Sequence, residues 1–195
     1  MHAGPYWDYD QSYGNTPYEL MNDPRVLNFC TAHGQNTVLF YDLWTKYPAF
    51  RSLVCDCYRE KLRPFIMELL NGGLEAYAER IRANAEADMG RWSRDPDSVS
   101  HSVEDIREFL NERVKFLDRV WLDGELFHIV HFDTPTRKRR LYLGILDGES
   151  IKCIPNFSGK KGSVWTDKET GELVDDSTPI EKNRVLIDKN EENTQ

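Results

Sequence analysis

The chain has 195 residues, of which 39% are hydrophobic and 30% are charged, a balance typical of a globular protein that can bury a core. Its formal net charge of -8 argues against binding to a nucleic-acid backbone, because such binding needs a basic surface that displaces counterions. No apolar run approaches the ~20 residues of a membrane-spanning helix, and residues 1–15 have neither the basic start nor the apolar stretch of an export signal. The composition therefore indicates a folded protein that has no membrane span and does not bind nucleic acid.

Two carboxylates, Asp8 and Asp10, lie one residue apart among aromatic side chains near the start of the chain. We call residues 4–15 the front motif. Hard divalent cations such as Mg²⁺ prefer oxygen ligands, and packed aromatic neighbours can hold a carboxylate toward a phosphate-bound ion. The pattern predicts part of a metal-phosphate site with Asp8 as the ligand and Asp10 as a second ligand or a brace. The alternative is a pair of turn carboxylates, since Asp favours turns and Gly14-Asn15 is a turn signal.

Helical periodicity dominates the chain from residue 38 onward. Two helices are predicted over residues 38–47 and 49–62, separated by Pro48, and Asn71-Gly72-Gly73 interrupts the pattern. In the next predicted helix, apolar residues recur at intervals of three and four and should form a face buried in the core. These residues are Leu74, Tyr77, Ala78, Ile81, Ala85, Met89 and Trp92.

A further helix is predicted to begin at Ser102, where a hydroxyl can cap free amides with Asp105 three residues on, and to end before Gly124. After Gly124 the apolar pattern changes to a period of two. Residues 126–132 and 140–145 therefore predict a β-hairpin around a turn that contains Pro135.

Three separated segments resemble the spore-coat protein H (CotH) family of atypical protein kinases. The front motif resembles the family's Trp-Asp-aromatic-Asp motif. Residues 40–51, with the segments Phe40-Tyr41-Asp42-Leu43-Trp44 and Tyr47-Pro48-Ala49-Phe50-Arg51, look like its helix pair. Residues 109–118, which include Arg113 and Leu117-Asp118, look like its closing helix.

The resemblance implies ATP and a divalent ion such as Mg²⁺ as cofactors, with Asp8 and Asp10 at the metal. Trp7 then packs the motif at the nucleotide, and Asn15 adds an amide oxygen. It also implies an exported or surface protein as the substrate, an extracellular or cell-surface location in the parent protein, and similarity to the second half of the kinase domain. Because the motif begins three residues after Met1, and the chain offers neither a glycine-rich phosphate loop nor an evident catalytic base, we expect no phosphate transfer by these residues alone.

The last part of the chain resembles the internalin-type B-repeat, a small β-grasp-like module of bacterial surface proteins. Trp165 can plug a thin core, Gly171 suits a hairpin turn, and residues 185–187 would close the sheet. Ser163 and Val164 precede Trp165 where the repeat has a Gly-Trp pair. A single copy of the repeat is indicated.

The sequence predicts an α+β architecture. We expect a helical, kinase C-lobe-like segment over residues 1–124 and a β-rich module over residues 125–195, with a disordered tail from about residue 189. The leading hypothesis is the C-terminal portion of a CotH-like kinase that acts on a protein substrate. The alternative is a non-catalytic surface or interaction module whose working part is the B-repeat.

Overall fold

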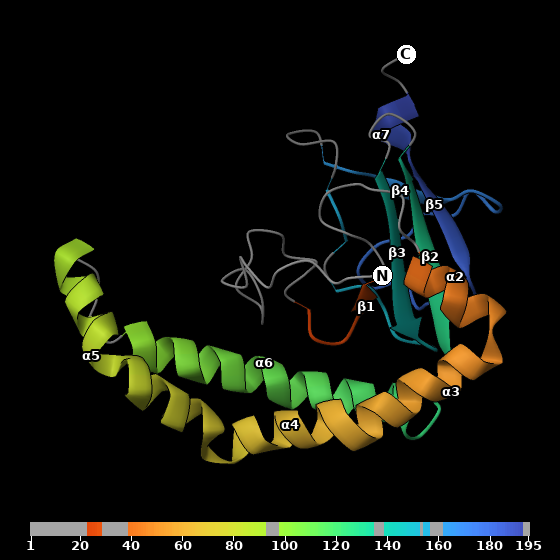
Figure 1. Cartoon of the computed structure of the whole chain (residues 1–195). Coiled ribbons are helices and arrows are strands. Elements are labelled where there is room, and N and C mark those ends of the chain that lie inside the picture. The colour runs from red at the N-terminus through yellow and green to blue at the C-terminus, as the bar shows by residue number, and fades with distance from the viewer. Residues whose placement is uncertain are drawn as a thin grey trace.

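The computed structural model describes residues 23–28, 39–92, 98–134, 139–152, 154–156 and 162–192. A helical half precedes a small mixed β-sheet, so the predicted α+β class is confirmed (Figure 1). No helix within these ranges is long and apolar enough to cross a membrane.

The first helices form a curved arm along one side of the molecule (Figure 1). The predicted break at Pro48 is confirmed, although Pro48 itself stands in the first turn of the second helix, where its missing amide costs no hydrogen bond. Near the far end of the first long stretch, Gly72 adopts φ 107°, a left-handed conformation that favours glycine, and the chain bends there. The elements are α2 (Leu39–Lys46), α3 (Pro48–Cys57), the π-helical turn η2 (Tyr58–Leu62), α4 (Arg63–Glu68), the π-helical turn η3 (Leu69–Gly73) and α5 (Leu74–Trp92).

The prediction that one face of α5 is buried core is wrong. Ala78 is buried, but Tyr77 and Ile81 are each 55% exposed and Trp92 is 62% exposed. Helix α5 packs beside η3 and one long helix, α6 (Ser98–Trp121), and its outer side meets no second layer among the described residues. The periodic pattern therefore marks a face that is only partly covered.

Helix α6 begins four residues before the predicted start at Ser102. Residues 98–101 contain neither Gly nor Pro, so nothing in them stops the helix from extending toward its N-terminus. Its end agrees with the sequence, because Gly124 adopts φ 71° and the amide of Glu125 donates to the carbonyl oxygen of Arg119 at 2.9 Å.

Among the described residues the sheet contains five strands, in the order β1-β3-β2-β5-β4. The predicted hairpin is confirmed by the antiparallel pairing of β2 and β3. Strand β5 pairs in parallel with β2 and antiparallel with β4, so residues 185–187 lie inside the sheet and β4 forms its edge. The strands are β1 (Leu27–Asn28), β2 (Phe127–Thr134), β3 (Arg139–Leu146), β4 (Trp165–Asp167) and β5 (Arg184–Asp188).

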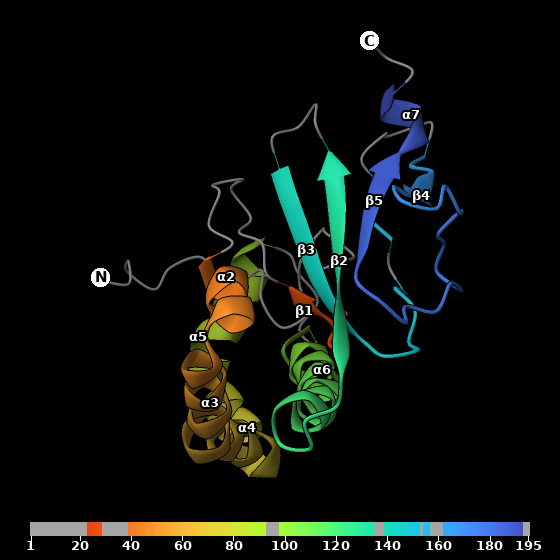
Figure 2. The ribbon, with the colours of Figure 1, turned by 90° about the vertical axis from the view of Figure 1, so that its right-hand side faces the viewer.

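Alternate residues of β2 serve two different cores. Ile129 points to the helices, where it clusters with Tyr58, Leu117 and other residues of η2 and α6. Phe132 points to the other face and contacts Trp165 edge-on, with ring centroids 4.8 Å apart. Figure 2 shows α6 between the α3–α5 arm and the strands. The sheet is therefore the second layer that α6 packs against.

The C-terminal part agrees with the predicted turn and differs from the predicted tail. Gly171 adopts φ 75°, and its amide donates to the carbonyl oxygen of Asp167 at 2.8 Å. Disorder was predicted from about residue 189, whereas a short helix, α7 (Lys189–Glu192), follows β5. The Asn190 side chain there donates to the carbonyl oxygen of Gly162 at 2.7 Å, which ties the start of this helix to the segment that precedes β4.

Candidate functional site

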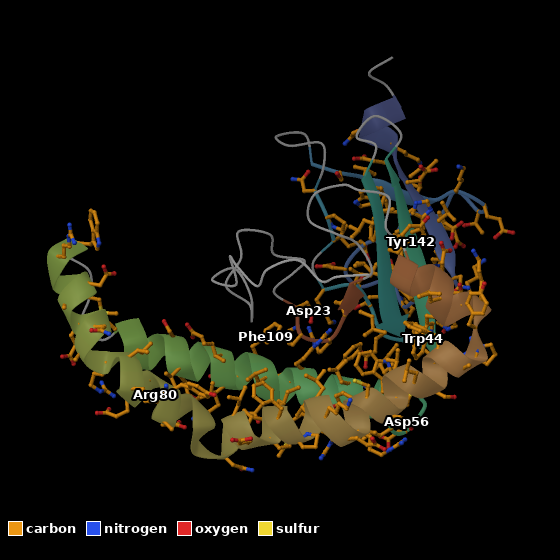
Figure 3. The ribbon with its side chains drawn as sticks, in the orientation of Figure 1. Asp23, Trp44, Asp56, Arg80, Phe109 and Tyr142 are labelled. Carbon is orange, nitrogen blue, oxygen red and sulfur yellow. The ribbon has the colours of Figure 1, made fainter. Side chains whose placement is uncertain are left out.

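The predicted site residues Trp7, Asp8, Asp10 and Asn15 lie outside the residues that the structure describes. The described chain begins at Asp23, and we call residues 23–28 the anchor segment. In Figure 3, Asp23 lies beside β1 and above α6. The anchor segment is therefore the described part of the chain that comes nearest, in sequence, to the front motif.

The anchor segment starts with a tight turn built by Asp23. The Asp23 carboxylate is 6% exposed, accepts a hydrogen bond from the backbone amide of Arg25 at 2.9 Å, and pairs with the Arg25 guanidinium at 3.1 Å. An Asp side chain that bonds the amide two residues on closes a turn locally. This turn directs the chain into β1.

Two neighbouring side chains of the anchor segment enter different cores. Val26 and Leu27 are each 5% exposed, with Val26 in the cluster on the far face of the sheet and Leu27 in the cluster shared with η2 and α6. Leu27 also pairs with Gly144 of β3. Each side chain packs against a different layer. A change in the register of the segment against β3 would therefore expose apolar surface.

Arg113 of α6 holds the backbone of the anchor segment. Its guanidinium donates hydrogen bonds to the carbonyl oxygens of Pro24 at 2.9 Å and Val26 at 2.6 Å, and it lies over the ring of Phe116. Burial lowers the pKa of Arg113 to about 10, although the charge of Asp23 acts in the opposite direction. The group therefore remains a cation at neutral pH and makes charge-assisted hydrogen bonds.

A second polar cluster fixes α6 to the helical arm. Asp118 accepts hydrogen bonds from the Tyr58 hydroxyl at 2.7 Å and from Nε of Arg63 at 2.8 Å. Burial tends to raise the pKa of Asp118, but the hydrogen bonds from Arg63 and Tyr58 lower it overall. Burial, followed by the hydrogen bond to Asp118, raises the pKa of the Tyr58 phenol, which stays protonated.

Two other arginines also donate hydrogen bonds to backbone carbonyls near helix ends. Arg51 donates to the carbonyl oxygen of Trp44 at 2.8 Å, at the end of α2, and Arg107 donates to that of Leu70 at 3.0 Å, at the bend before Gly72. Carbonyls in the last turn of a helix have no partner within the helix, so a guanidinium satisfies them well. Arginine–carbonyl bonds therefore stabilise two breaks in the helical half as well as the anchor segment.

Two of the three segments that carried the family resemblance lie within the described residues, and each of them contacts the sheet. Residues 109–118 of α6 supply Arg113 to the anchor segment and Leu117 to the core shared with the sheet. Residues 40–51 form the corner between α2 and α3, where Trp44 contacts Phe127 of β2 with ring centroids 5.7 Å apart.

Sequence reasoning missed three residues of this arrangement: Asp23, Tyr58 and Arg63. The sequence Asp23-Pro24 is a turn signal that could have marked the first. Tyr58 and Arg63 lie in a predicted helix, where their spacing is unremarkable. Nothing in the local sequence indicates that they contact Asp118, which lies 60 residues after Tyr58. No group of three or more His, Cys, Asp or Glu side chains within the described ranges could hold a metal ion.

The fold and this site define an α+β protein. Its long helix α6 contacts the helical arm, the sheet and the anchor segment, which follows the front motif in the sequence. Residues 2–117 match the family described as CotH kinase protein. The match covers more than half of the chain, which therefore belongs to the CotH kinase protein family and is a kinase-related protein. No curated protein matches the chain, and no solved structure matches it.

Proposed function

We propose that this chain is the C-terminal portion of a CotH-like atypical protein kinase and contributes the metal carboxylates of its ATP site. Asp8 would hold a Mg²⁺ that neutralises phosphate charge, with Asp10 as a second ligand or a brace, Asn15 would add an amide oxygen, and Trp7 would pack the motif at the nucleotide. The observation that carries this proposal is that the front motif falls inside the family match over residues 2–117.

In this proposal the parent enzyme phosphorylates Ser or Thr of exported or surface proteins, outside the cell or on its surface. Phosphoryl transfer also needs a cation on the phosphates and a group that orients the acceptor hydroxyl. The lysines before Gly124 are exposed: Lys46 pairs with Asp42 of its own helix, Lys115 pairs with Glu112, and Lys61 lies on η2. We therefore expect these 195 residues to bind Mg²⁺ and ATP weakly and to transfer no measurable phosphate.

A second candidate function is a non-catalytic surface or interaction module, with the strands after Gly124 as a B-repeat-like working part. The observation in its favour is the strand arrangement. A central parallel pair, β2 and β5, is flanked by antiparallel strands, and Trp165, 1% exposed, fills the core beneath them. This arrangement is what a β-grasp-like module is expected to have.

Asp8→Asn tests the leading proposal by titration calorimetry of the full chain with ATP and Mg²⁺. The substitution keeps size and hydrogen bonding but removes the charge that faces the metal, so metal-dependent ATP binding should weaken by about 2–3 kcal/mol, on the order of a hundredfold. Asp10→Asn should cost less if Asp10 is a brace.

The matched control is Asp56→Asn on α3, because Asp56 is an exposed carboxylate, 57% accessible, that pairs with Arg59. It should bind like the wild type. Metal-dependent ATP binding that is equal in Asp8→Asn and the wild type, with both folded by circular dichroism, would show that Asp8 is a turn residue. Metal-dependent ATP binding that is absent from the wild type would contradict the proposal that these residues contribute to an ATP site. Transfer of radiolabelled phosphate above a buffer blank would contradict the expected inactivity.

A further inference from the structure

We propose that an exposed side of α5 is a docking surface for an acidic, amphipathic helix of another protein. The surface consists of Tyr77, Arg80, Ile81, Arg91 and Trp92, which we call the α5 stripe. It lies at the end of the helical arm, away from the sheet (Figure 1). The proposal does not depend on the proposed role of the front motif.

Three large apolar side chains lie along this side of α5. Tyr77 and Ile81 are one helical turn apart and Trp92 follows about three turns later, so the helical repeat places them on the same side. They are 55%, 55% and 62% exposed, respectively. Tyrosine and tryptophan are among the residues that contribute most to the stability of protein–protein interfaces, so this side of the helix has the composition of a binding surface.

Arg80 and Arg91 lie beside these apolar side chains, and neither pairs with a carboxylate of the described residues. The guanidinium of Arg80 lies 5.8 Å from the ring centroid of Tyr77, and that of Arg91 lies 5.6 Å from the ring centroid of Trp92. Every other arginine whose side chain the structure describes donates to a carboxylate or to a backbone carbonyl. The two exposed guanidinium groups therefore retain donors for an acceptor on another molecule.

The sequence of α5 leaves both arginines unpaired. The four residues three or four positions from Arg80 carry no carboxylate. These residues are Ala76, Tyr77, Ala83 and Asn84. Asp88 lies three positions before Arg91, but its carboxylate accepts a hydrogen bond from Nε1 of Trp92 at 3.1 Å. This bond and the guanidinium over the ring hold the exposed indole in place, so less order has to be gained when a partner binds.

The charge and spacing of the α5 stripe define the partner. Arg80 and Arg91 are eleven residues apart, about 17 Å along the helix. A second helix that lies along α5 repeats its side chains at the same interval, so it can present two carboxylates to the arginines and an apolar side to the aromatic rings. Ala83 and Ala87 are exposed beside the arginines, and their small side chains let a helix approach closely.

The experiment uses a pair of designed peptides as probes for the full chain. The first is a stapled helix of about 20 residues with leucines along one side and two glutamates at the spacing of Arg80 and Arg91. Its twin has lysines in place of the glutamates. Both carry a fluorescent label, and fluorescence anisotropy measures their binding.

The variants separate charge from apolar contact, and each has a matched control. Arg80→Gln combined with Arg91→Gln, the double variant, removes both cations. Its control is Arg82→Gln, because Arg82 points to a different side of α5 and pairs with Glu79 at 2.7 Å. Ile81→Ala removes an apolar contact, and its control is Leu53→Ala on α3, where Leu53 is 63% exposed.

We expect the wild type to bind the glutamate peptide on the order of tenfold more tightly than the lysine twin, and the double variant to lose this preference. Ile81→Ala should weaken both peptides by about threefold, whereas Arg82→Gln and Leu53→Ala should bind like the wild type. Raising NaCl from about 50 to about 500 mM should reduce the preference, because salt screens exposed charges. Equal binding of the two peptides by the wild type, or a preference that survives in the double variant, would overturn the inference.

Two other occupants would give different results, and either would also overturn the proposal. Dimers of the wild type in sedimentation equilibrium that the double variant does not form would identify a second copy of the chain as the occupant. Binding to vesicles of phosphatidylcholine and phosphatidylserine that needs both arginines, without a preference for the glutamate peptide, would identify a membrane surface. Circular dichroism checks the fold of each variant, and if the double variant does not fold, Arg80→Gln and Arg91→Gln are judged singly by the same outcomes.

Discussion

Apolar residues recur at intervals of three and four in both α5 and α6, but the two helices have very different surroundings. In α6, Leu110, Phe116 and Leu117 are each no more than 3% exposed, whereas Ala78 is the buried apolar residue of α5. Helix α6 lies between the helical arm and the sheet, so it has a layer on two sides (Figure 2). Helix α5 has α6 on one side and no further layer among the described residues.

Periodicity predicts an apolar face of a helix but not which element covers that face. An apolar stripe is buried only where another element supplies a complementary surface. The strands after Gly124 supply that surface for α6, beyond the range matched by the family. The helical half and the sheet therefore share one hydrophobic cluster.

The largest expected effect comes from the shared cluster. Leu117→Ala removes a side chain that is 3% exposed and touches both layers, so the free energy of unfolding should fall by about 2–5 kcal/mol. Urea unfolding followed by helical circular dichroism and by tryptophan fluorescence measures the change. Because both layers lose contacts, the two signals should shift together.

Separate transitions, with only the helical signal shifted by Leu117→Ala, would instead favour two independent units divided near Gly124. Limited proteolysis gives a second measurement of that predicted boundary. Preferential cleavage between Asp123 and Leu126, leaving two stable fragments, would agree with independent units. Cleavage that destabilises both fragments would agree with a shared core.

A smaller loss of stability is expected from the polar cluster that Asp118 of α6 forms with Tyr58 and Arg63. Asp118→Asn weakens the bonds from Tyr58 and Arg63, so unfolding should become easier by about 1–3 kcal/mol at neutral pH. The matched control is Glu79→Gln on α5, which breaks a pair of similar length with Arg82 but on an exposed surface, and should change stability by less than about 0.5 kcal/mol.

The pH dependence of Asp118 follows from its lowered pKa. A carboxyl whose pKa is lower in the folded state contributes stability above its unfolded pKa, close to 3.8, and this contribution is lost as the pH falls through the folded pKa. The stability difference between wild type and Asp118→Asn should therefore shrink in acid below that value. A constant difference down to pH 2 would show that the charge of Asp118 contributes nothing.

Much of the fold could be predicted from the sequence, because local signals set its elements. Pro48 and Gly124 mark helix boundaries by their backbone chemistry, and a period of two identifies the hairpin of β2 and β3. The parallel pairing of β5 with β2 could not be predicted, since it joins residues more than 50 positions apart that share no local pattern. The exposed face of α5 was missed because its exposure depends on which distant elements pack against it, and no local pattern encodes that packing.

Part of the candidate site could likewise be predicted from local sequence, and part could not. Local chemistry singles out the carboxylates Asp8 and Asp10, and their metal role stays a prediction. The contacts of Arg113 with Pro24 and Val26 link residues more than 80 positions apart, and only the fold reveals them. Side chains that hold a segment from a distance carry no spacing signal in a single sequence.

The smallest effect is expected on the outer face of α5. Ile81→Ala removes an aliphatic side chain comparable in size to Leu117, but Ile81 is 55% exposed. Little apolar area returns to water, and alanine has the higher helix propensity, so stability should change by no more than about 0.5 kcal/mol. Urea unfolding at two protein concentrations measures the change. A loss above about 1.5 kcal/mol would show that this face is covered in solution. If that loss grew with concentration, self-association would be the cause, and the contrast between α5 and α6 would hold only for the isolated chain.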